Sequence, residues 1–249
     1  MTSLDTLTIN SDRLRSDFDE LAEIGKTRGG GISRLALSTA DIEARSWFAD
    51  RIEEAGLFLR DDDVGNVSGV LFSGKKNART LLVGSHLDSV PNGGRYDGAV
   101  GVLAGLEVLR VVKEAGLELP VHLEVIDFTD EEGTWQSLFG SMGLTGQLGA
   151  VHFSDSIDDR GPFRAALKRA GIHPNDYLKA RRDPATIAAY LELHIEQGRK
   201  LYDANIDIGV VTRIIGRTTY QLTFLGEAGH SGTTRPENRR DALKGASDF

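Results

Sequence analysis

Three apolar segments of this chain end in side chains that bind metals or transfer protons, and this pattern constrains the fold most. The segments cover residues 81–83, 121–129 and 189–193. The polar residues that follow them are His86 with Asp88, Glu131 with Glu132, and His194. Short apolar runs are typical of buried parallel strands. Open α/β sheets bind ligands beyond the carboxyl ends of such strands, so we predict a site where the three segments end.

The segment between the first two predicted strands supports this arrangement. Apolar residues from 100 to 112 follow a helical pattern that is apolar on most sides and ends at Gly116, as in a helix buried against a sheet. A strand, a crossover helix and a second strand form a βαβ unit, whose strand ends open onto one crevice. This unit brings Glu131 and Glu132 toward His86 and toward Asp97, which lies in the glycine-rich loop before the helix.

The remaining elements predict the fold class. Helical spacing is found at residues 11–24, with Ser11 as the expected N-cap, and at 39–55, with Ser38 or Thr39 as the cap. Further strands are predicted at 57–60 and 66–72, and short surface helices at 153–186, one of them starting at Gly161. We predict an α/β fold with a mixed, largely parallel sheet and helices on both faces.

The pattern changes in the last part of the chain. From residue 206 to 227, apolar and polar residues alternate as in a half-exposed antiparallel sheet, and a helix is predicted to begin near Pro236. We place one domain at residues 1–213 and the beginning of a second at 214–249. Two strands and one helix are too few for a stable domain, so we expect the sequence to be the front part of a longer protein.

The composition restricts the class of partner. The net charge at pH 7 is −8, with 37 acidic against 29 basic residues, which argues against a nucleic-acid-binding protein. No apolar run approaches the roughly 20 residues that span a bilayer, and the N-terminus lacks a leader pattern, so we expect a cytoplasmic protein without membrane contact. There are no cysteines, which leaves histidine and carboxylate as ligands for any metal ion.

The residues at the strand ends permit dinuclear metal chemistry. Two imidazoles and several carboxylates can hold two divalent ions about 3.5–4 Å apart, and Asp97 is best placed to bridge them. Of Glu131 and Glu132, one can bind metal while the other takes a proton from the water. Asp88 is a natural partner for the N–H of the His86 imidazole. Zn²⁺, Mn²⁺, Co²⁺ and Ni²⁺ all suit this set of donors.

Four blocks carry a resemblance to a known family. In family order, they are G-S-H-L-D-S-V-P-N-G-G-R-Y-D-G, F-T-D-E-E-G, L-E-L-H-I-E-Q-G and G-E-A-G-H-S-G-T-T. The sequence resembles the dinuclear-metal amidohydrolases of the hydantoinase/carbamoylase family, which includes N-carbamoyl-L-amino-acid hydrolase, allantoate amidohydrolase and β-ureidopropionase. The resemblance implies a metallo-exopeptidase-like catalytic domain and the start of an α+β, ferredoxin-like lid domain.

The resemblance also implies roles for individual residues around the metals. His86, Asp97 and His194 are expected to hold one ion, and Glu132 with Asp97 the other. Glu131 is expected to be the general base that activates a hydroxide bridging the two metals. Family members have a cis peptide after the bridging aspartate, here between Asp97 and Gly98.

Substrate recognition is implied at two further positions. Gln197 is expected to contact substrate beside the metals. His230, in the lid domain, is expected to polarise the scissile carbonyl, from its own subunit or from the neighbouring subunit of a homodimer formed through the lid. The substrate is then a small N-carbamoyl or ureido compound whose linear C–N bond is hydrolysed.

The sequence also departs from the family pattern. Residues 133–136 read Gly-Thr-Trp-Gln where the family tends to have Gly-Ser-Arg-Phe, which predicts altered pocket contacts. In the family, a final histidine ligand and the residues that bind the substrate carboxylate lie in segments beyond those matched here. The alternative is therefore an inactive or non-catalytic fragment that keeps the fold and binds metal only partially.

Overall fold

The computed structural model describes residues 7–153, 161–214, 216, 218 and 220–249. The chain divides into two compact units, residues 1–197 and 198–249, and each is described by itself. The acidic residues Asp155, Asp158 and Asp159 of the predicted surface segment lie outside the described residues. The domain boundary expected at 213/214 stays a prediction.

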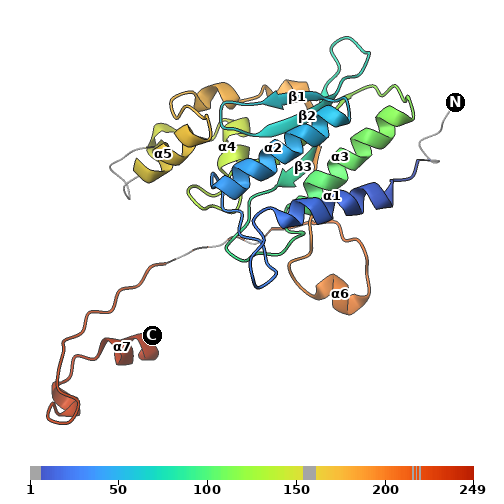
Figure 1. The fold of residues 1–249 in the computed structure, drawn as a ribbon. Coiled ribbons are helices and arrows are strands. Elements are labelled where there is room, and N and C mark those ends of the chain that lie inside the picture. Colours follow the sequence, from blue (N-terminus) through green and yellow to red (C-terminus); the bar gives the residue numbers. More distant parts are fainter. Residues whose placement is uncertain (1–6, 154–160, 215, 217, 219) are drawn as a thin grey trace. The chain divides into compact units, whose positions relative to one another are not determined.

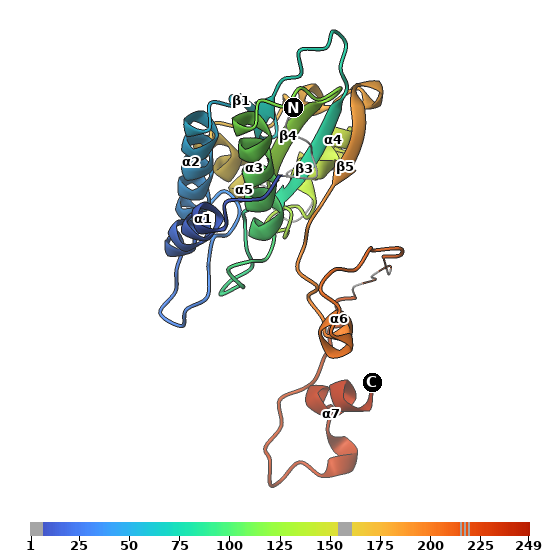
Figure 2. The same ribbon diagram turned by 90° about the vertical axis from the view of Figure 1, so that its right-hand side faces the viewer.

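The first unit is built on a five-stranded mixed sheet with strand order β1-β2-β4-β3-β5. Strands β1, β2 and β3 are labelled in Figure 1, and β4 and β5 in Figure 2. The strands are β1 Phe58–Asp61, β2 Val67–Leu71, β3 Thr80–His86, β4 His122–Phe128 and β5 Ile187–Leu191. Strand β3 pairs in parallel with both β4 and β5. Strand β2 pairs antiparallel with β1 and β4. The predicted mixed sheet is confirmed, and its parallel part carries the predicted site.

Three long helices cover one face of the sheet (Figure 2). They are α1 Ser11–Glu23, α2 Thr39–Glu54 and α3 Ala99–Glu114. Local capping explains where two of them begin, because the side chain of Asn10 accepts the N–H of Arg13 and that of Ser38 accepts the N–H of Asp41. The cap of the first helix is therefore Asn10 and not Ser11. Both residue types accept this bond, and only Asn10 lies outside the first helical turn.

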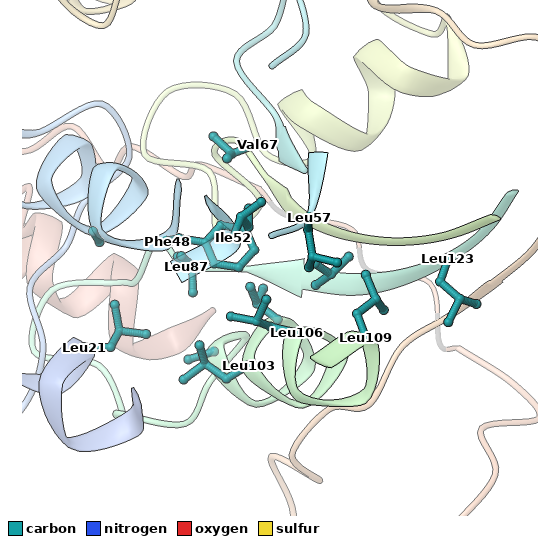
Figure 3. Close-up of a cluster of buried hydrophobic side chains, with 14 of the residues drawn as sticks. Leu21, Phe48, Ile52, Leu57, Val67, Leu87, Leu103, Leu106, Leu109 and Leu123 are labelled. Carbon is teal, nitrogen blue, oxygen red and sulfur yellow. The ribbon is translucent and has the colours of Figure 1, made fainter. Parts of the chain in front are cut away.

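The main core lies between these helices and the sheet (Figure 3). Its members are fully buried or nearly so and include Leu21, Phe48, Ile52, Leu103, Leu106, Leu109, Leu123 and Val125. Strand β4 alternates between two cores, because Leu123 and Val125 face this cluster whereas Ile126 and Phe128 pack with Leu82 and Leu144 on the other face. This two-residue period is that of a strand buried on both faces.

Leu144 of a shorter helix packs on the second face with Leu82, Ile126 and Phe128, and further short helices follow it in the chain. These shorter helices are α4 Phe139–Thr145, α5 Gly161–Arg169 and the 3-10 helices Ala150–Phe153, Tyr177–Ala180 and Pro184–Thr186. The rings of Phe139, Phe153 and Phe163 are buried together there. Helices on both faces were predicted, and the described part of α5 starts at Gly161.

The second unit differs from its prediction. It contains α6 Lys200–Ala204, the 3-10 helix Pro236–Asn238 and α7 Ala242–Asp248. The antiparallel strands predicted over residues 206–227 are wrong for the described part of that range, which contains no strand. Ile208, Val210 and Ile214 are 72%, 87% and 91% exposed. An alternating segment forms a strand only when a second strand and an apolar layer cover it.

Within the described ranges, no helix combines the length and the apolar character needed to cross a bilayer.

Candidate metal centre

The first arm of the site is the carboxyl end of β3, which delivers His86. The residue is only 5% exposed. Its Nδ1 lies 3.0 Å from the backbone oxygen of Asp88. This contact favours the tautomer in which Nδ1–H donates to the carbonyl and Nε2 keeps its lone pair, the form that binds a metal ion through Nε2.

The loop after β3 brings Asp97 to the same place. Gly98, the N-cap of α3, has a φ of +65°, and a Cβ there would lie 2.4 Å from the carbonyl oxygen of His86. Only glycine permits this close approach. The expected cis peptide between Asp97 and Gly98 is wrong, because the described part of the chain contains no cis bond. The turn is made instead through the positive φ of Gly98.

The second arm follows β5. Pairing with β3 ends where Leu191 meets Val83, and the chain continues to His194. The Nε2 of His194 lies 3.2 Å from Oδ1 of Asp97, and its Nδ1 lies 2.9 Å from the backbone oxygen of Ile195. The side-chain amide of Gln197 donates to both oxygens of Asp97 at 3.0 and 2.8 Å. Gln197 therefore lies beside the predicted ligands.

These contacts bring together one ligand atom each from His86, Asp97 and His194, all within 4.8 Å of one another. Among the described residues this is the one group of three or more potential ligands so close together. Two imidazole nitrogens and a carboxylate oxygen suit a divalent ion. At bond lengths of about 2.0–2.2 Å, two ligand atoms of one zinc ion lie at most about 4.4 Å apart, so small side-chain shifts complete the shell.

The turn after β4 is joined to the first arm by Asp88. The carboxylate of Asp88 accepts the backbone N–H groups of Glu131 and Glu132, each at 3.2 Å. Its Oδ1 lies 3.6 Å from Nδ1 of His86, so its backbone oxygen is the closer contact. Asp130 also stabilises the turn, because its carboxylate accepts backbone N–H groups of residues 134–136.

Glu131 has the properties of a general base. Burial raises its pKa to about 7, against the opposing effect of a hydrogen bond from Ser141. The Oγ of Ser141 lies 3.1 and 3.3 Å from the two carboxylate oxygens. A base whose pKa is near neutrality is well matched to proton transfer at that pH. Glu132 is half-buried, and its carboxylate does not belong to the group of three, so its role as a ligand stays a prediction.

The structure adds residues that sequence reasoning missed. Glu192 accepts from Ser85 Oγ at 2.6 Å and from the hydroxyl of Tyr190 at 2.9 Å. That hydroxyl also lies 3.0 Å from the backbone oxygen of Gly84. A signal was present, because Tyr190, Glu192 and His194 are spaced by two, as residues on one face of an extended chain are. These contacts tie the β5 extension to β3.

His230 belongs to the second unit, where its side chain is hydrogen-bonded within a turn. Its Nδ1 accepts the backbone N–H groups of Gly232 and Thr233 at 3.1 and 3.2 Å. The side chain of Arg239 donates to the carbonyls of Ser231 and Thr234 on either side of this turn. An accepting Nδ1 places the imidazole proton on Nε2, which leaves His230 able to donate one hydrogen bond.

Comparison with known proteins gives a consistent result. The model of the family described as Peptidase family M28 matches residues 66–180. Among the relatives, an N-carbamoyl-L-amino acid amidohydrolase of Geobacillus stearothermophilus is 40% identical over 97% of this chain and 59% of its own length. An allantoate amidohydrolase of Bacillus subtilis is 35% identical over 93% of this chain and 57% of its own.

The structural comparison agrees. The crystal structure of a hydantoinase/carbamoylase family amidase from Burkholderia ambifaria superposes with a TM-score of 0.74 and 34% identity. It covers 97% of this chain, which in turn covers 59% of that protein. The chain therefore spans somewhat less than two thirds of the length of the relatives it matches.

Proposed function

Because the chain belongs to the hydantoinase/carbamoylase family of amidases, we propose that it provides the metal centre of an amidohydrolase that cleaves linear amide or ureido C–N bonds. The substrate class is an N-carbamoyl-L-amino acid or allantoate, the compounds in the names of the two relatives above. The observation that carries the proposal is the group formed by His86, Asp97 and His194, next to the turn that holds Glu131.

The proposed roles follow the positions of the side chains. His86, Asp97 and His194 hold one divalent cation, and Glu132 with Asp97 holds a second. When bound, such cations supply Lewis acidity toward a water molecule and the scissile carbonyl. Glu131 takes a proton from that water and passes it to the leaving amine, for which its pKa of about 7 is suited.

Two further residues act on the substrate in this proposal. Gln197 contacts it beside the metals, which its position against Asp97 supports. His230 donates its Nε2–H to the scissile carbonyl, which the acceptor role of its Nδ1 supports. We extend the proposal to a catalytic domain at residues 1–213, a lid that begins at 214–249 and a homodimer formed through that lid.

The test combines metal content with turnover. We expect plasma emission spectroscopy to find bound Zn²⁺, Mn²⁺, Co²⁺ or Ni²⁺ after dialysis of the protein completed to the length of its relatives. The same protein should release ammonia from an N-carbamoyl-L-amino acid or from allantoate. Glu131→Gln should keep the metal and abolish turnover, whereas the exposed Glu53→Gln should keep both. Turnover by Glu131→Gln would refute the role of the base.

The alternative is a non-catalytic chain that keeps the fold and binds metal partially. It is supported by the finding that the described residues assemble one group of three ligands and not two. For the 249-residue chain alone, this alternative predicts weak metal binding and no ammonia release. Two tightly bound ions per chain after dialysis would contradict it.

A further inference from the structure

Two buried ionisable side chains bind the peptide groups of Leu87, the residue between His86 and Asp88. Oδ1 of Asp127 accepts the Leu87 N–H at 2.8 Å. Nε of Arg34 donates to the Leu87 carbonyl oxygen at 2.6 Å. Leu87 is completely buried, and Asp127 and Arg34 are each 2% exposed. The N–H and the C=O of Leu87 are therefore both hydrogen-bonded to buried ionisable side chains.

The two groups reach Leu87 from different parts of the fold. Asp127 lies on β4 opposite Ser85, and its side chain extends past the end of β3. Arg34 lies between α1 and α2, where its Nη1 also donates to the carbonyls of Leu21 and Ile24, each at 3.1 Å. Arg34 thus connects the end of α1 with the end of β3.

The position of Leu87 explains why these contacts are needed. Strand β3 ends at His86, so the peptide groups of Leu87 are buried but have left the ladder of the sheet. A buried peptide group without a hydrogen-bond partner destabilises the fold. The hydrogen bond from the Arg34 guanidinium has a positively charged donor and is stronger than one between neutral groups. Because both the N–H and the carbonyl of Leu87 are hydrogen-bonded, the backbone conformation at Leu87 is fixed. The positions of the neighbouring residues His86 and Asp88 are fixed with it.

We propose that Asp127 and Arg34 are positioning residues of the metal centre, which raise its metal affinity by holding the Leu87 backbone. The inference rests on the proposed function, because it takes His86 as a ligand. It adds two residues that contact neither metal nor substrate. Groups that orient metal ligands typically change metal affinity by about 10–100-fold when they are removed.

Oδ2 of Asp127 also lies 3.7 Å from Nε of Arg45 in a largely buried ion pair, and another buried ion pair on the same strand offers a matched control. Glu124 is completely buried, and its carboxylate accepts two hydrogen bonds from Arg182 at 2.6 and 2.7 Å. It lies opposite Leu82, four positions before His86 on β3. Removal of this carboxylate disturbs a buried pair of the same kind, but not the residues beside His86.

The experiment measures Zn²⁺ affinity by competition with a chelator, on variants whose folding is verified by circular dichroism. Asp127→Ala should bind Zn²⁺ about 10–100-fold more weakly than the unchanged protein. Asp127→Asn keeps an oxygen that can accept the Leu87 N–H, so its affinity should stay within about threefold of the unchanged protein, below the range expected for Asp127→Ala. Glu124→Ala should also stay near the unchanged affinity, although it is less stable.

Two outcomes would overturn the proposal. One is unchanged affinity in Asp127→Ala, and the other is an equal loss in Glu124→Ala, since both would show a role in general stability alone. If Asp127→Ala does not fold, Arg34→Lys decides the question. Lysine lacks the separate Nε and Nη1 donors with which Arg34 binds Leu87 on one side and Leu21 with Ile24 on the other, so weaker binding is expected and unchanged binding refutes the proposal.

His86→Ala separates this inference from the proposed function. If His86→Ala binds Zn²⁺ as tightly as the unchanged protein, the metal centre is not where we place it and both proposals fail. If His86→Ala loses Zn²⁺ whereas Asp127→Ala and Arg34→Lys keep it, only the positioning role fails.

Discussion

The two arms of the candidate metal centre are held in place by different means. His86 ends β3, which is paired on both sides, and is almost completely buried. His194 follows β5 at the edge of the sheet, beyond the last paired residue Leu191, and is more exposed. Backbone pairing fixes the first arm. The second depends on side-chain contacts, those of Glu192 and Tyr190 above all.

The largest expected effect comes from a substitution that separates β3 from β4, because the first arm depends on this backbone pairing. A Cβ on Gly84 would lie 2.0 Å from the backbone oxygen of Ile126, its partner on β4. We expect Gly84→Val to destabilise the protein by more than about 4 kcal/mol, because backbone cannot move away as a flexible side chain can. Ala189→Val on β5 should change stability little. Thermal unfolding measures both, and similar melting temperatures for the two variants would contradict the contrast.

The next largest difference in stability is expected between truncations of two leucines, one packed in the core beside β3 and the other on β5. Leu106 of α3 is completely buried against the sheet (Figure 3), whereas Leu191 of β5 is 56% exposed. Leu106→Ala should cost about 2–5 kcal/mol, because it leaves a cavity. Leu191→Ala should stay within about 0.5 kcal/mol. Urea unfolding with equal m-values for both variants tests this, and equal losses would show that the edge strand is as well packed as the centre.

The buried arm should also make stability depend on pH. Burial raises the pKa of Asp127 to about 7, while Arg45 opposes the shift and the negative charges of Asp41 and Asp88 add to it. The folded protein then keeps a proton that the unfolded chain loses above its ordinary pKa near 4. Stability is therefore highest below that value and is lost as pH rises through 7.

We expect the free energy of unfolding of the metal-free protein to fall by at least about 1.4 kcal/mol between pH 5 and pH 8. Asp127→Asn removes one of the buried carboxyl groups whose pKa is raised and should make this dependence on pH shallower. Chemical unfolding of both proteins in the presence of EDTA measures the difference. An identical slope for Asp127→Asn would show that Asp127 is not responsible.

The smallest effect is expected on the exposed arm. Tyr190→Phe removes the hydroxyl that contacts Glu192 and the Gly84 carbonyl, on a residue that is 41% exposed. Because water replaces part of these hydrogen bonds, the loss should be about 0.5–1 kcal/mol. Tyr220→Phe, at a residue 79% exposed, serves as the control. A loss above about 2 kcal/mol would place Tyr190 among the fixed parts of the sheet.

The same contrast explains how well strands could be predicted. The run at 121–129 lies within one residue of both ends of β4, whereas the run at 81–83 begins within one residue of the start of β3 and stops three residues before its end. Both runs were recognised because a strand buried on both faces needs apolar side chains at nearly every position. The run at 189–193 was also recognised, but β5 covers Ile187–Leu191. The last two residues of the predicted run lie beyond the pairing with β3. The end of β5 is therefore set by where its pairing with β3 stops, and not by the length of the apolar run.

The site shows a similar division. That His86, Asp97 and His194 would meet was inferred from strand ends and from a family resemblance, and the structure brings them together. The network around Leu87 was not foreseen. Arg34 and Asp127 are separated from Leu87 by 53 and 40 residues in the chain. In the sequence they are an ordinary basic residue before a helix and an acidic residue within a strand.

The sequence alone determined the long helices, the parallel strands and the chemistry at the strand ends, because periodicity, capping and apolar runs act over a few neighbouring residues. Only the tertiary structure decided which segments found a partner. Residues 206–214 alternate as a strand would and yet form none, because alternation cannot supply a second strand. It also decided that Asp88 supports the glutamate turn and that Asp127 and Arg34 hold Leu87, because buried polar groups bond to whatever the fold places beside them.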